Sequence, residues 1–205
     1  MGGRGATSGG WTGGAGGVAN IISTTDLISE RERKQVEVDE TLQAFQDVYD
    51  KYGYQVEQIQ IATMGASDAG VMAYYDGSNI AINQTYFNKA NMDSAYDACV
   101  KSGYHPPQGN KTALQAVASH ELGHALTDEV SAKIGRDGAT AILNEATKNA
   151  GYKKASTMAG AISGYAKTSP KECIAEAFSD VYCNGNNAHK ESIAIVNVID
   201  KYLKK

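Results

Sequence analysis

The strongest constraint on the fold of this chain is a pair of histidines four residues apart, within the sequence HELGH at residues 120–124. Residues four apart on an α-helix share one face, so both imidazoles can reach a single metal ion. Glu121 would then lie beside the open coordination position of that ion, where a carboxylate can act on a water molecule. The pattern therefore requires a helix at these positions and a further ligand from another part of the chain.

The flanking residues predict that this motif lies inside a helix at about 112–127. Thr112 and Gln115 have the spacing of a capping box, which marks a helix start. Gly123 disfavours a helix by about 1 kcal/mol relative to alanine, so we expect another segment to pack closely against it. Two surface histidines on an ordinary amphipathic helix are the weaker interpretation. Apolar residues recur at helical spacing, namely Leu114, Val117, Ala118, Leu122, Ala125 and Leu126.

Composition narrows the classes of function. A chain of 205 residues is long enough for one domain with a single core. The net charge of -4 gives no basic surface for nucleic acid or for an anionic membrane. No apolar run reaches the length of about eighteen residues that a membrane span needs, and the N-terminus lacks the apolar stretch of a signal peptide. We therefore expect no nucleic-acid or membrane partner, and a cytoplasmic or phage-associated location.

The patterning predicts an α+β protein. Residues 1–22 are rich in glycine and are expected to form a flexible tail, followed by one domain over 23–205. An N-terminal lobe at about 23–110 would contain a long helix from Asp26 to about Tyr52 and a small, mainly antiparallel sheet. A C-terminal lobe at about 128–205 would be entirely helical. The expected strands are 56–62, 71–75 and 79–87, and the other expected helices are 92–101, 138–149, 155–162, 170–183 and 190–204.

The helix expected at 170–183 offers a third metal ligand. A catalytic zinc ion usually takes three protein ligands and keeps one position for water. Glu172, Glu176 and Asp180 lie four residues apart and share one face of this helix. Ser169, however, can form a capping box with Glu172, which would leave Glu176 as the next candidate. Spacing alone does not choose between Glu172 and Glu176.

The two motifs together resemble a known family. HELGH combined with ECIAEAF at 172–178 is similar to the gluzincin metallopeptidases related to anthrax lethal factor and the Pro-Pro endopeptidases, whose ligand helix carries an E-x-x-A-E-A-F pattern. The resemblance covers roughly residues 100–205. It implies a zincin-like fold and a zinc-dependent endopeptidase.

The resemblance also implies roles for individual residues. His120, His124 and Glu172 would bind Zn²⁺, while Glu176 would support the site without touching the ion. The family places a tyrosine seven residues before the ligand glutamate, and Tyr165 stands at that offset. Tyr165 would then stabilise the oxyanion of the reaction, and Glu121 would be the general base.

Enzymes of this kind bind a protein or peptide substrate in an extended conformation beside an edge strand. The last strand before the motif helix, at 79–87, is the candidate edge, which makes Asn83 a candidate substrate contact. His105, in the loop before that helix, is a second candidate for contact with substrate or zinc. A histidine at such a position more often orders a turn.

Two other interpretations stay open at this stage. The first is a structural or interaction module in which zinc only stabilises the fold. Such sites usually close with a fourth Cys or His, and neither Cys173 nor Cys183 has suitable spacing. The second is the same peptidase chemistry within a phage or prophage particle, because the glycine-rich start resembles tails of phage-encoded metallopeptidase-like proteins.

Overall fold

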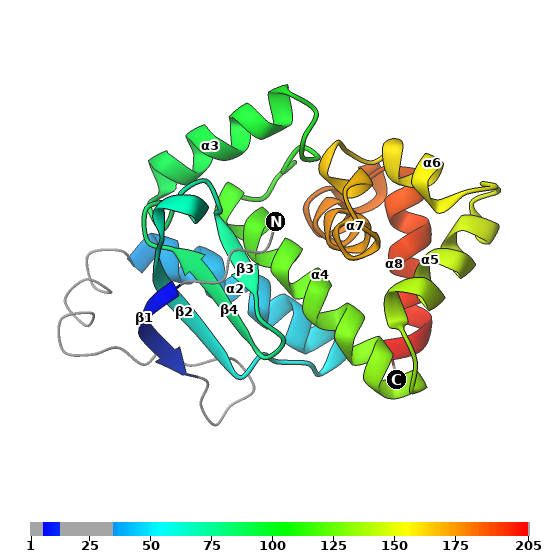
Figure 1. The fold of residues 1–205 in the computed structure, drawn as a ribbon, viewed down its shortest axis with the longest axis horizontal. Helices are drawn as coiled ribbons and strands as arrows, with labels where there is room; N and C mark the ends of the chain where they lie inside the picture. The colour runs from blue at the N-terminus through cyan, green and yellow to red at the C-terminus, as the bar shows by residue number, and fades with distance from the viewer. Residues whose placement is uncertain (1–5, 13–34, 205) are drawn as a thin grey trace.

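The computed structural model describes residues 6–12 and 35–204. These residues form a mixed sheet and seven α-helices, which confirms the α+β class (Figure 1). The strands are β1 (Ala6–Thr12), β2 (Gln58–Met64), β3 (Ala73–Tyr75) and β4 (Asn79–Asn83). The helices are α2 (Gln35–Tyr52), α3 (Lys89–Lys101), α4 (Ala113–Ile134), α5 (Gly138–Asn149), α6 (Ala155–Gly160), α7 (Pro170–Asn184) and α8 (Lys190–Leu203). None of the described helices has the length and apolar character needed to cross a membrane.

The sheet has the strand order β1-β2-β4-β3 and is mixed rather than mainly antiparallel. β2 and β4 pair in parallel, with Ile59 opposite Ile80 and Ile61 opposite Ile82. The other two pairings, β1 with β2 and β3 with β4, are antiparallel. β-Branched residues on both strands of the parallel pair are buried and fill the core between the sheet and the helices.

Two predictions differ from the structure at this sheet. Residues 6–12, predicted as part of a flexible tail, form β1, because pairing with β2 gives their backbone the hydrogen bonds that composition alone does not reveal. The strand at 79–87 was predicted to be the sheet edge, but β4 lies between β2 and β3. The edge nearest the motif helix is β3. The remainder of the predicted tail and the predicted helix start at Asp26 lie outside the described residues.

Helix α4 carries the HELGH motif and runs between the sheet and the C-terminal helices (Figure 1). The predicted capping box is confirmed: the Thr112 hydroxyl accepts from the Gln115 N–H at 3.3 Å, and the Gln115 side chain accepts from the Thr112 N–H at 3.0 Å. The helix ends at Gly135, which has a left-handed φ of 66°. Its residues are buried on nearly all sides, so α4 is held between the sheet and the C-terminal helices.

Gly123 allows α4 and α7 to approach closely, as its position in a helix had suggested. A Cβ atom at residue 123 would lie 2.8 Å from Ala175 Cα and 3.1 Å from Phe178 Cβ. The first of these neighbours is a backbone atom of α7 and cannot move without displacing the helix. The small residue is therefore required by the crossing of the two helices.

We expect Gly123→Ala to lower the free energy of unfolding by about 1–3 kcal/mol, as overpacking does, despite the better helix propensity of alanine. Gly160→Ala in α6 is the matched control, because its Cβ would meet only the flexible Lys167 side chain, at an ordinary 3.6 Å or more. Urea unfolding of both variants measures the difference. A Gly123→Ala protein as stable as the control would contradict the packing argument.

Candidate metal centre

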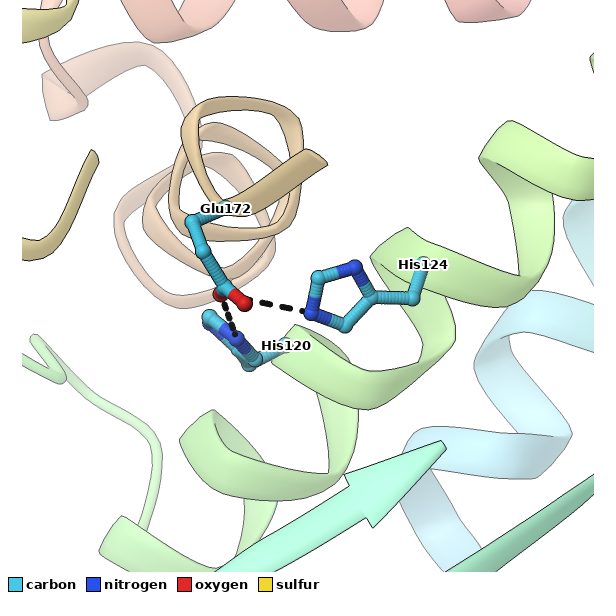
Figure 2. Close-up of side chains that lie close together, drawn as sticks. All are labelled: His120, His124 and Glu172. Atoms are coloured by element: carbon cyan, nitrogen blue, oxygen red, sulfur yellow. Dashed lines mark hydrogen bonds and ion pairs between the residues drawn. The ribbon is translucent and has the colours of Figure 1, made fainter. Parts of the chain in front are cut away.

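Three side chains from two helices converge on one point (Figure 2). His120 and His124 project from α4, and Glu172 projects from the first turn of α7. Glu172 Oε2 lies 3.0 Å from His120 Nε2 and 3.3 Å from His124 Nε2. The candidate ligand atoms of this group all lie within 4.8 Å of one another, so the group can hold a metal ion.

The start of α7 explains why Glu172 is available for this group. Ser169 caps the helix by accepting a hydrogen bond from the Glu172 N–H at 3.1 Å, and Pro170 occupies the first turn. The Glu172 carboxylate turns toward the two histidines instead of back toward the cap (Figure 2). Glu172 therefore takes part in the helix cap through its backbone N–H alone. Its side chain contacts the two histidines and does not complete the capping box considered from the sequence.

Glu176 lies one turn further along α7 and supports the group from behind. Its side chain is 2% exposed, and Oε1 lies 2.8 Å from His120 Nδ1. His105 Nδ1 lies 2.8 Å from the same oxygen, while the Ser163 hydroxyl donates to Oε2 at 2.8 Å. Asp180, the third candidate on this face, instead accepts from the His189 N–H at 2.9 Å. The geometry thus places Glu172 with the ligand atoms and Glu176 outside them.

The charges of the cluster are strongly coupled. Burial alone would raise the pKa of Glu176, but the hydrogen bond from His105 and the close contact with His120 outweigh burial and hold that pKa at about 2. Burial likewise opposes ionisation of Glu172, yet the two motif histidines lower its pKa well below the usual range. The pKa of His120 is raised, because contacts with Glu172 and Glu176 outweigh desolvation. The site is therefore built around charged carboxylates.

Glu121 faces the same space from α4. It is 6% exposed, and burial raises the pKa of its carboxyl group. The charges of His120 and His124 and a hydrogen bond from the Tyr75 backbone oppose that rise. A carboxylate with a raised pKa takes up a proton more readily than an exposed one, which suits it to act as a general base.

Tyr165 approaches the cluster from a short turn that precedes α7. Its ring stacks on the His120 imidazole, with centroids 5.7 Å apart and planes 14° apart. Burial and the charge of Glu172 raise the pKa of its hydroxyl, so the group is neutral and able to donate a hydrogen bond. Tyr165 thus lies in the wall of the space that the ligand group faces.

A cavity of about 770 Å³ joins these groups to the sheet edge. Its walls include Glu121, Tyr165, the ligand group and the whole of β3. β3 pairs with β4 on one side and lines this cavity on the other. The cavity is therefore an open cleft between an edge strand and the candidate metal centre.

The two candidate substrate contacts have different positions from those expected. Asn83 is 2% exposed; its side chain donates to the Val71 carbonyl at 2.8 Å and accepts from the Thr85 N–H at 3.0 Å. Asn83 is thus a structural residue that fixes the segment leading into β3, and its prediction as a substrate contact is wrong. His105 does line the cavity, but its Nδ1 is directed to Glu176.

Two residues that surround the site were not identified from the sequence. The Ser163 hydroxyl donates to Glu176, and the Tyr104 ring stacks on Tyr165 with centroids 4.9 Å apart. Neither belongs to a recognisable motif, and their roles arise from contacts between segments distant in sequence.

No family model, no curated protein and no solved structure matches the chain.

We expect Glu172→Gln to weaken Zn²⁺ binding by more than Glu176→Gln, whose loss should fall in the roughly 10–100-fold range of outer-shell residues. The reason is that Glu172 lies among the ligand atoms, whereas Glu176 contacts the Nδ1 side of His120. Competition with a chromophoric chelator measures both affinities. Glu129→Gln, an exposed change of equal charge on α4, is the control. The opposite order of losses would contradict the assignment.

Proposed function

We propose that this protein is a zinc-dependent endopeptidase of the gluzincin type that acts on protein or peptide segments in extended conformation. One observation carries the proposal: the ligand group, Glu121, Tyr165 and an edge strand line the same cavity. The HELGH pattern alone can arise by chance. Three residues outside the motif, namely Glu172, Glu176 and Tyr165, lie around the same point, and this argues for a catalytic site.

The donor set of the centre fits zinc. Two imidazoles and one carboxylate are a common catalytic ligand set, and this ion accepts all three at tetrahedral geometry. Among the described residues, the group contains three ligands and no fourth His or Cys, which favours a catalytic over a structural site. When bound, zinc lowers the pKa of a water molecule and polarises a peptide carbonyl.

In the proposed reaction, Glu121 moves the proton. Its carboxylate takes a proton from water as the oxygen attacks the peptide carbon, and then delivers that proton to the leaving amine as the C–N bond breaks. This carboxylate is buried and lines the same cavity as the residues of β3, where the substrate would bind.

Tyr165 would stabilise the negative charge that develops on the carbonyl oxygen. A neutral hydroxyl donates one hydrogen bond without carrying charge itself, and its stacking on His120 holds it next to the ligand group. The main chain of β3 would bind the substrate backbone as an additional strand. This replaces β4, which lies inside the sheet, as the proposed substrate edge.

A peptide library derived from a proteome tests the function directly. Purified protein with Zn²⁺ should create new peptide termini that mass spectrometry detects, and a zinc chelator should abolish them. Bound zinc with no cleavage of any library member would instead favour the structural module.

We expect Glu121→Gln to reduce kcat/KM for a cleaved peptide by about 10²–10⁴-fold, because the amide cannot accept the proton. The variant keeps the size of the side chain, so zinc affinity should stay close to that of the unmodified protein. Chelator competition and peptide kinetics on the same preparation separate the two effects. Retained activity in Glu121→Gln would exclude this residue as the base.

We expect Tyr165→Phe to lower kcat by about 10²-fold with little change in KM, since the hydroxyl is proposed to act only as charge develops. The phenylalanine ring can still stack on His120, so zinc affinity is the internal control. A tyrosine that merely anchors its loop would leave kcat unchanged.

A further inference from the structure

His105 and His120 share one buried carboxylate oxygen. Both Nδ1 atoms lie 2.8 Å from Glu176 Oε1, although the two histidines come from different segments. The side chain of His105 is 14% exposed and that of Glu176 is 2% exposed. A residue of the loop before α4 is thus joined to a candidate metal ligand through a carboxylate that is shielded from water.

The shared oxygen restrains the orientation of the His120 ring. Glu176 Oε1 lies 2.8 Å from His120 Nδ1, although this close contact does not have the geometry of a hydrogen bond. On the other side of the ring, Nε2 lies 3.0 Å from Glu172 Oε2 in the ligand group. Contacts at both nitrogens therefore keep Nε2 directed at the place where a metal ion would bind.

Packing holds the His105 ring in position for this contact. The ring stacks on Tyr96, with centroids 5.4 Å apart and planes 3° apart. It meets the Tyr165 ring edge to face, with centroids 5.4 Å apart and planes 90° apart. With one face against Tyr96 and an edge contact to Tyr165, the imidazole has little freedom to turn its Nδ1 away from Glu176.

The loop that carries His105 is also tied to the segment that carries Tyr165. The Gly164 N–H donates to the Gly103 carbonyl at 2.8 Å, and the Tyr165 N–H donates to the Tyr104 carbonyl at 3.0 Å. These bonds fix the loop relative to the metal centre from a second direction. His105 is therefore placed by a rigid support rather than by a free loop.

We propose that His105 is a positioning residue that acts through Glu176 to hold the His120 ring in the orientation that binds metal. This role differs from the contact with substrate or zinc considered from the sequence. It rests on metal binding in the proposed function, but not on peptide hydrolysis. His105 thus extends the metal centre to a third segment of the chain, outside α4 and α7.

Two substitutions separate the hydrogen bond from the packing. His105→Phe keeps a ring that can stack on Tyr96 but removes the donor. His105→Asn loses the ring but keeps an N–H donor at about the place of Nδ1. We expect Zn²⁺ affinity, measured by chelator competition, to fall about 10-fold or more in His105→Phe and to recover toward the original value in His105→Asn.

The controls address folding and the loop. Thermal unfolding of the metal-free variants reports whether either change disturbs the fold. Gln108 lies in the same loop as His105 and donates to Asp97 of α3, so Gln108→Ala removes a contact of this loop and should leave zinc affinity unchanged. Unchanged affinity in His105→Phe would overturn the proposal, and so would an equal loss in His105→Phe and His105→Asn.

A double-mutant cycle tests whether the effect passes through Glu176. If it does, adding His105→Phe to Glu176→Gln should weaken zinc binding little beyond Glu176→Gln alone. Additive losses would mean that His105 acts independently of Glu176, which contradicts the proposal. Peptide cleavage is scored separately: the expected affinities in a protein that cleaves no peptide would support this inference while refuting the proposed function.

Discussion

The close crossing of α4 and α7 at Gly123 is the contact on which the candidate metal centre depends. α4 supplies both histidines and α7 supplies both glutamates, so the separation of the two helices sets every distance among them. With Gly123 facing the Ala175 backbone, no Cβ holds the helices apart. Two short carboxylate side chains can then reach the two imidazoles, Glu172 at Nε2 and Glu176 at Nδ1 of His120. A wider crossing would break both contacts together.

The buried charges at this crossing are better explained by binding than by stability. Removing carboxylates and imidazoles from water is costly, and ion pairs inside proteins seldom repay that cost in full. Here the two glutamates remain charged because histidines and hydrogen-bond donors surround them. Such a network keeps each ring and carboxylate in a single orientation, as the residues that surround metal ligands do in metalloproteins. The helix-helix core, rich in buried apolar residues, supplies the stability that the polar cluster does not.

Local signals in the chain predicted the helices well and the sheet poorly. α5 was expected at 138–149 and is found at Gly138–Asn149, and α8 begins at the expected residue 190. Caps and apolar periodicity act within a few residues, so they can be read from a short window. Strand order depends instead on contacts between distant segments. The short strand at 73–75 became the edge because β4 pairs in parallel with β2, and no local pattern encodes that choice.

The sequence by itself determined the helix that carries HELGH, its capping box and the need for a close partner at Gly123, because these follow from helical spacing and from the absence of a side chain. It also limited the third ligand to the acidic face of one helix. The tertiary structure decided that Glu172 joins the ligand atoms, that Glu176 joins His105 to His120, and that Asn83 is buried away from the cleft. Spacing restricts which side chains share a helix face, whereas the depth and angle of the helix crossing decide which of them meet.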